Sequence, residues 1–205
     1  MAEAKVSRSV PAHLVQLTVG GASEPWHRIG VSFDTRGGCR IGQVTLHLDD
    51  QSSVGHCSWA FDPEVSVIDG VPSASRVPAG EVVSTTYCLV DHVVVMTDSL
   101  ERTSSMIESA AGLALRKTRD ASGGVRQAFH RSGEVVIEVV EAPNITEPHL
   151  WGFVLVAPEF DRVLGELGES VVSAARAAVQ PGRRIATVRR EVGLGVHVAL
   201  MSADQ

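Results

Sequence analysis

The sequence predicts an α+β protein in which a β-α-β-β-β unit occurs twice. Residues 91–97 read as a strand, 98–112 as a helix, and three further extended runs end at 134–140. About sixty residues later the same order recurs, with a strand at 151–156, a helix at 159–172 and three extended runs that end at 195–201. One such unit is too small to bury its own apolar face, so the two copies are expected to pack together.

The two predicted helices carry boundary signals. Asp98 is a candidate N-cap, and Glu101 three residues later completes the pattern of a capping box. Gly112 suits the position just after a helix, where the backbone often turns left-handed. In the second copy, Pro158 stands near the first turn, where its missing N–H costs little.

Two polar side chains stand among apolar ones on the strands of the first copy. His92 lies on the opening strand, and Glu138 lies between two valines on the same face of the closing strand. Burying an unpaired carboxylate is costly, so Glu138 calls for a metal ion or an arginine beside it. Gly152 and Ala199 occupy the matching places in the second copy, so only one copy keeps two candidate ligands.

A fainter echo precedes the two copies. Residues 13–18 resemble 92–97, and 40–47 resemble 131–138, with only a short stretch between them for a helix. The N-terminal block is therefore a candidate shortened third module. The next stretch is rich in Pro, Gly and Ser and predicts a linker. The expected division is an N-terminal block at 1–62, a linker at 63–88, a first module at 89–142 and a second at 149–203, the two modules forming one domain.

Composition limits the classes of partner. Of the 205 residues, 44% are hydrophobic, which is ample for a packed core. The net charge of −6 argues against nucleic acid as a partner, because phosphate binding needs a basic face. No apolar run reaches the roughly 18 residues of a membrane span. Residues 1–19 lack the pattern of a secretory signal, and three cysteines without C-x-x-C spacing predict free thiols, so the expected location is cytoplasmic.

The order of elements and the two polar positions resemble the vicinal oxygen chelate superfamily. Its members include glyoxalase I, methylmalonyl-CoA epimerase, extradiol dioxygenases and the fosfomycin- and bleomycin-resistance proteins. Asp91-His92 at the start of one copy and Ile137-Glu138-Val139 at its close carry the resemblance, which covers about residues 89–203. Residues 179–187 followed by 193–196 are more narrowly similar to uncharacterised glyoxalase-like domain proteins of actinobacteria.

The resemblance implies a fold and a chemistry. Paired modules curl into a cup-shaped mixed sheet with helices outside, and the cup holds a divalent metal that polarises a substrate oxygen. Carried over, His92 and Glu138 would be metal ligands, and Glu138 a catalytic base. Two protein ligands are fewer than the usual three, so a third is expected from His197, on the face of Ala199, from His130 or from another subunit. The expected cofactor is Zn, Ni, Fe, Mn or Co, or none.

Three further residues are candidates for substrate contact. His130 lies on the strand before Glu138, although such a histidine is often a core residue. Arg183 and Arg184 could clamp a carboxylate or phosphate at the mouth of the cup, because guanidinium forks match those anions, although a solvent-facing position is the simpler interpretation. A four-ligand set of His13, His47, His92 and Glu138 is a further alternative if the N-terminal block pairs with the first module.

Three functional classes follow. The first is a metal-dependent lyase, isomerase or dioxygenase that acts on a small oxygen-rich metabolite. The second is a metal-free protein that sequesters a small molecule, as the bleomycin-resistance proteins do. The third is a scaffold whose modules merely pack. A homodimer is expected in any of them, because members of this superfamily often complete their sites across subunits.

Overall fold

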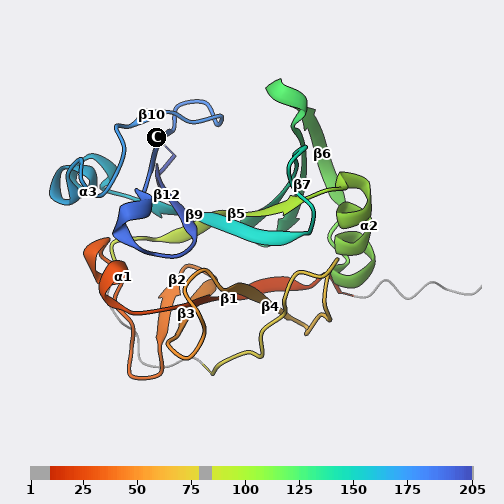
Figure 1. Ribbon diagram of the computed structural model, residues 1–205, viewed down its shortest axis with the longest axis horizontal. Helices are drawn as coiled ribbons and strands as arrows, with labels where there is room; N and C mark the ends of the chain where they lie inside the picture. The colour runs from red at the N-terminus through yellow and green to blue at the C-terminus, as the bar shows by residue number, and fades with distance from the viewer. Residues whose placement is uncertain (1–9, 79–84, 205) are drawn as a thin grey trace, which may run out of the picture.

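The computed structural model describes residues 10–78 and 85–204, which form two β-sheets (Figure 1). One sheet has four strands in the order β2-β3-β1-β4, and the other has eight in the order β10-β11-β12-β9-β5-β8-β7-β6. No helix among the described residues is long and apolar enough to cross a membrane.

The eight-stranded sheet consists of two β-α-β-β-β modules, which confirms the predicted fold class. The first contains β5 (Leu89–Thr97), α2 (Leu100–Ala111), β6 (Leu115–Asp120), β7 (Arg126–Ser132) and β8 (Val135–Glu141), with a 3-10 turn at Ser122–Gly124. The second contains β9 (His149–Ala157), α3 (Phe160–Leu167), β10 (Arg176–Ala177), β11 (Arg184–Thr187) and β12 (His197–Ser202), with a 3-10 turn at Arg190–Val192.

The modules meet at the centre of this sheet. β5 pairs with β8 in parallel and β9 with β12 in parallel, while β5 and β9 run antiparallel to each other. In Figure 1 the β5–β9 pair forms a floor from which β6 and β7 rise on one side and β12 on the other. The sheet is therefore curled, with a concave face between its two raised ends.

Helix α2 begins one residue later than predicted. Ser99, not Asp98, is the N-cap, and its hydroxyl accepts a hydrogen bond from the backbone N–H of Arg102 at 3.4 Å. The Asp98 carboxylate instead pairs with the Arg102 guanidinium, so the capping box is wrong. The predicted end is confirmed, since Gly112 follows the helix with a φ of 68°.

Helix α3 is shorter than the predicted 159–172. It ends at Leu167, because Gly168 leaves the helix with a φ of 72°. The backbone N–H groups of Val171 and Val172 then both donate to the Gly168 carbonyl, and Val172 forms a bridge to Val188. The expected last turn of the helix is therefore a tight turn that leads back to the sheet.

The N-terminal sheet packs against the convex face of the larger sheet. It contains β1 (His13–Gly20), β2 (Gly38–Ile41), β3 (Val44–Asp49) and β4 (Cys57–Asp62), with α1 (Glu24–Arg28) after β1. One hydrophobic cluster contains the fully buried Leu17 and Trp59 of the small sheet and Val93 and Val95 of the large one. Trp26 of α1 stacks on Phe153 of β9, with ring centroids 6.1 Å apart.

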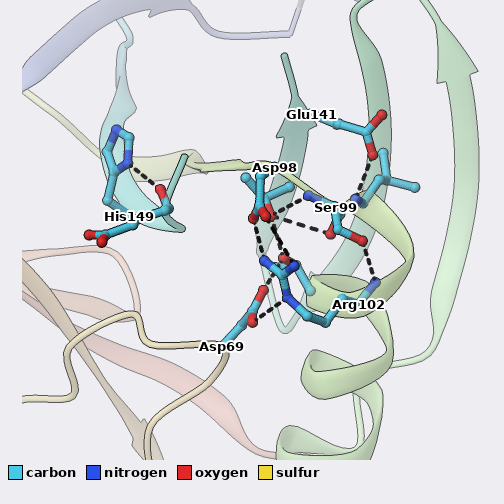
Figure 2. A network of polar contacts seen from close by, with 10 residues as sticks. Asp69, Asp98, Ser99, Arg102, Glu141 and His149 are labelled. Atoms are coloured by element: carbon cyan, nitrogen blue, oxygen red, sulfur yellow. Dashed lines mark hydrogen bonds and ion pairs between the residues drawn. The ribbon is translucent and has the colours of Figure 1, made fainter. Parts of the chain in front are cut away.

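The segment between β4 and β5 is fastened to α2 (Figure 2). The Asp69 carboxylate accepts hydrogen bonds from the Thr103 hydroxyl and, at 2.8 Å, from Nε of Arg102. Ile68 and Val71 on either side are fully buried. The described part of the predicted linker is therefore an ordered strap across the molecule, and its residues 79–84 lie outside the described residues.

Candidate functional site

A cavity of about 350 Å³ lies on the concave face of the eight-stranded sheet, between the two modules. The walls are mostly apolar, and the polar groups that line the cavity come from six residues. The apolar lining is Val94, Met96, Val140, Trp151, Phe153, Val154, Ile185, Val198 and Ala199, and the polar lining is His92, Gln127, Glu138, Arg176, Thr187 and His197. Such an apolar hollow with a few convergent polar groups is typical of a small-molecule site.

His92 and Glu138 lie together in this cavity. Because β5 and β8 pair in parallel with Val94 opposite Glu138, the carboxylate comes beside His92, and His92 Nε2 lies 3.5 Å from Glu138 Oε2. The other carboxylate oxygen of Glu138 accepts a hydrogen bond of 2.6 Å from the Gln127 amide. Both side chains of the pair are only 15% exposed, so the pair is a largely desolvated acid–base unit.

A second carboxylate orients His92 from behind. Asp91 Oδ2 lies 2.8 Å from His92 Nδ1, and Asp91 Oδ1 accepts a hydrogen bond of 2.5 Å from Arg183. Burial alone would raise the pKa of Asp91, but hydrogen bonds from His92 and Arg183 outweigh it and hold that pKa at about 2. Asp91 is therefore ionised at neutral pH and fixes the His92 ring with Nε2 toward Glu138.

The two positions of the second module that match His92 and Glu138 carry no donor side chains. The pairing of β9 with β12 places Val154 opposite Ala199, just as Val94 is opposite Glu138, and Gly152 holds the place of His92. A Cβ at Gly152 would lie 1.9 Å from the His197 carbonyl oxygen, so this strand contact admits only glycine. Gly152 and Ala199 therefore widen the cavity and leave no polar side chain at the places that match the His92–Glu138 pair.

His197 lines the rim of the cavity and has other partners. Its ring stacks on Trp151, with centroids 3.9 Å apart and planes 8° apart, and its Nε2 lies 3.2 Å from the Arg190 guanidinium. Burial and the charge of Arg190 both lower the pKa of His197. The neutral His197 imidazole accepts a hydrogen bond from Arg190 and lies flat on Trp151, so the two rings together form an aromatic wall at the rim of the cavity.

The other three predicted contact residues do not line the cavity. His130 is buried between α2 and β7, where its ring nitrogens lie 2.8 Å from the Leu113 carbonyl and 3.1 Å from the Ser104 hydroxyl. Arg183 is buried and holds Asp91. Arg184 lies on the outside, where it pairs with Asp161 of α3.

Two residues of the site, Gln127 and Trp151, and one contact, the ion pair of Asp91 with Arg183, were not predicted from the sequence. Asp91 and Arg183 form an ion pair across the two modules, which only the fold brings together. Gln127 reaches Glu138 across the β7–β8 pair. Trp151 is 40% exposed and lines the cavity. Strand alternation from Gly152 would place it on the core face, but the β5–β9 pairing shifts its register between Gly152 and Leu150, and Trp151 is the extra residue at that irregularity.

The donor set does not fit a catalytic metal within one chain. Two side chains, His92 and Glu138, converge, whereas three protein ligands are usual. No group of three or more His, Cys, Asp or Glu side chains within residues 10–78 and 85–204 is arranged to hold a metal ion. The four-ligand alternative also fails, since His13 and His47 belong to the other sheet.

Comparison with solved structures supports the fold. Methylmalonyl-CoA epimerase from Mycobacterium tuberculosis is similar over 61% of this chain and 94% of its own, with 15% identity and a TM-score of 0.50. A hypothetical protein from Bacillus halodurans matches 57% of this chain and 94% of its own, with 19% identity and a TM-score of 0.48. A Streptomyces coelicolor methylmalonyl-CoA epimerase in complex with 2-nitronate-propionyl-CoA matches 60% of this chain and 100% of its own, with 17% identity and a TM-score of 0.47. At 15% identity the likeness to the first shows the fold alone.

No protein-family model matches the sequence, and the search of curated proteins finds no match either.

Proposed function

We propose that this protein binds a small molecule in the cup of its C-terminal domain without the help of a metal ion. The observation that carries the proposal is the asymmetry of the cavity, in which a His92–Glu138 pair faces an apolar wall at Gly152 and Ala199. The pair supplies hydrogen bonds to one polar end of a ligand, and the wall receives an apolar body.

The lining defines the class of ligand. Inside the cup the only full positive charge comes from Arg176 at β10, while valines, Met96 and Ile185 cover most of the surface. A ligand with several anionic groups would lose its hydration without gaining partners. The cavity therefore suits a molecule with one hydroxyl, carbonyl or amine next to His92 and a planar or aliphatic body that reaches the Trp151–His197 wall.

A metal-dependent isomerase or lyase is the second candidate. Histidines that bind metals usually hold a carboxylate on the other ring nitrogen, as Asp91 does for His92. The epimerases that match in structure act, by their names, on methylmalonyl-CoA, which makes proton transfer next to a carbonyl the reaction to test first. A partner subunit of the expected homodimer would have to supply the third ligand. The narrower similarity of residues 179–187 and 193–196 to actinobacterial glyoxalase-like domain proteins stays a prediction.

A direct test separates the two candidates. Metal content is measured on protein purified without an affinity tag, before and after incubation with zinc, nickel, iron, manganese and cobalt. The proposal expects no stoichiometric metal in the wild type. About one equivalent of metal that is lost in both His92→Ala and Glu138→Gln would contradict it and establish the second candidate.

Ligands are then sought with thermal shifts over dicarbonyl, catechol, acyl-CoA and aromatic amine or alcohol panels. Trp26 and Trp59 are buried, so the exposed Trp151 should report binding by its fluorescence. We expect a hit to change the Trp151 signal, to lose at least about tenfold in affinity in His92→Ala, and to be blocked by Ala199→Trp, which fills the cup. A hit unaffected by both variants would bind elsewhere.

A further inference from the structure

The N-terminal sheet repeats the centre of the large sheet. Its order β2-β3-β1-β4 matches β7-β8-β5-β9, with the same parallel pair in the middle and the same antiparallel neighbour. The registers define equivalent residues. His47 lies opposite Thr18 as Glu138 lies opposite Val94, and Thr18 lies opposite Ser58 as Val94 lies opposite Gly152.

A shared turn supports this equivalence. Between β2 and β3, Arg40 donates from Nε to the Gly42 carbonyl at 2.6 Å, and between β7 and β8, Arg131 donates from Nε to the Gly133 carbonyl at 3.1 Å. Both glycines have a φ close to 60°. An arginine therefore closes the same left-handed turn in both sheets. The alignment that superposes these two turns also places His47 at the position of Glu138.

The strap after β4 completes the likeness. Ser73 forms a parallel bridge with Trp59 of β4, just as β12 runs parallel to β9. Gln16, which holds the position of His92, fastens this strap, since its amide donates to the Ser75 carbonyl at 3.2 Å and accepts from the Val77 N–H at 2.8 Å. The small sheet therefore has its own half-covered concave face, directed away from the large sheet.

A second cavity lies on that face. It has a volume of about 310 Å³ and is lined by Thr18, His47, Asp49, His56, Ser58, Pro72, Ser73, Ala74, Ser75 and Val77. Thr18 and Ser58, the residues equivalent to Val94 and Gly152, are almost fully buried. This cavity occupies the place that the cup occupies in the large sheet.

One polar atom next to this cavity is unexplained by the protein itself. Nδ1 of His47 is buried and has no hydrogen-bond partner among the described residues. Buried polar atoms are nearly always paired, and an exception needs a reason such as a missing ligand or water. The Cε1–Nδ1 edge of the ring lies toward Gly37, where a Cβ would be 3.3 Å from Cε1 and 3.4 Å from Nδ1.

We propose that this N-terminal cavity is a second binding site, for a small oxyanion such as the carboxylate or phosphate of a metabolite. The available groups are donors. The Thr18 oxygen already accepts from the Gln16 amide at 2.9 Å, which leaves its O–H to donate into the cavity. The Ser58 oxygen lies 3.3 Å from His56 Nε2, and its O–H is free to donate into the cavity when that nitrogen carries a proton.

One carboxylate, that of Asp49, also lines the cavity. Its two oxygens accept hydrogen bonds from the Ser52 hydroxyl at 2.7 Å and from the Gln51 N–H at 3.1 Å, so both are engaged within their own turn. These donors are neutral and leave the charge in place, so the anion is assigned to the part of the cavity lined by the buried Thr18 and Ser58 hydroxyls. The proposal is independent of the proposed function of the large cup, which lies on the opposite side of the two packed sheets.

The full chain, labelled with ¹⁵N, is titrated at about pH 6.5, where an ordinary histidine is half protonated, with inorganic phosphate in one arm and acetate in the other at constant ionic strength. We expect the His47 ring resonances to shift and saturate in at least one arm. The arm that saturates at lower concentration identifies the preferred anion. Thr18→Val, which keeps the shape of the side chain, should weaken binding at least about tenfold.

Two control variants carry similar substitutions outside this cavity. Thr45→Val changes a threonine of β3 that does not line the cavity, and Glu138→Gln alters the other cup, so both should bind the anion as the wild type does. Ser58→Ala is a second test variant. Two results would overturn the proposal. One is a shift of the His47 resonances that stays linear up to about 50 mM of both anions, which is weaker than any affinity of biological use. The other is an unchanged affinity in Thr18→Val and Ser58→Ala.

Discussion

At the scale of single residues, Gly152 fixes how closely β9 and β12 approach. A methyl group there would lie 1.9 Å from the His197 carbonyl oxygen and 2.7 Å from its carbon, both of which are backbone atoms that cannot rotate away. We therefore expect Gly152→Ala to lower the free energy of unfolding by about 1–3 kcal/mol, as overpacking does. Urea denaturation measures the change.

Gly165 in α3 provides the matched control for this substitution. Nothing lies within 4 Å of a Cβ at that position, and the residue is within a helix. Gly165→Ala should therefore raise the free energy of unfolding, by about 0.5–1 kcal/mol, because alanine favours the helix. Equal effects of the two substitutions would mean that the β9–β12 contact is looser than described.

The sequence predicted half of the polar end of the cup. His92 and Glu138 could be paired in advance because each interrupts an apolar strand at a matching position of one module. Asp91 was visible beside His92, but its importance depends on Arg183, which lies in the other module and reaches it only after folding. His130 failed as a contact residue because strand alternation says which residues share a face, but not whether that face meets the cavity or α2.

At the scale of elements, His130 ties α2 to β7 in a way that depends on pH. Burial lowers its pKa in the folded protein, so below about pH 6.5 the unfolded chain binds a proton that the folded chain does not. Stability is therefore lost as pH falls, by at most about 1.4 kcal/mol per pH unit for this one group.

The variant His130→Gln tests this assignment. It should cost stability at neutral pH, because hydrogen bonds to Leu113 and Ser104 are weakened, yet flatten the fall in stability between about pH 7 and pH 5. Urea unfolding at several pH values measures both effects. An unchanged slope would show that other groups, such as His197 with its lowered pKa, dominate the acid response.

Asp69 is a buried and Asp98 an exposed carboxylate, and both lie beside Arg102 (Figure 2). Both pair with Arg102, but the Asp69 side chain is 9% exposed and that of Asp98 is 36% exposed. Asp69→Asn should destabilise the protein by about 1–2 kcal/mol, because charged hydrogen bonds to Arg102 and Thr103 are lost. Asp98→Asn should cost less, because an exposed ion pair contributes little to stability. Thermal unfolding of the two variants compares them directly, and a larger loss in Asp98→Asn would contradict the assignment.

At the scale of the whole molecule, two sheets of related topology share one core, back to back. Gln43 joins them, since its amide donates to the carbonyls of Leu14 and Ser132 and accepts from the Glu134 N–H. The sequence echo between 40–47 and 131–138 agrees with the pairing registers, whereas the echo between 13–18 and 92–97 is displaced, because Gln16 and not His13 holds the position of His92. An alternating strand sequence shows which residues share a face, but the pairing register can still shift by an even number of residues. The bulge between Leu14 and Gln16 inserts an extra residue, so the register can also shift by an odd number.

The shared core implies that the C-terminal domain depends on the N-terminal sheet. Val93, Val95, Ile137 and Leu155 on the convex face are fully buried in the full chain. Each such side chain contributes about 1.5–3 kcal/mol through burial. A shortened chain of residues 86–204 should therefore aggregate or associate through this face, which size-exclusion chromatography with light scattering detects. A monomer as stable as the full chain would mean that the two modules bury their own convex face, and that the N-terminal sheet is a separate unit whose contribution is its own cavity.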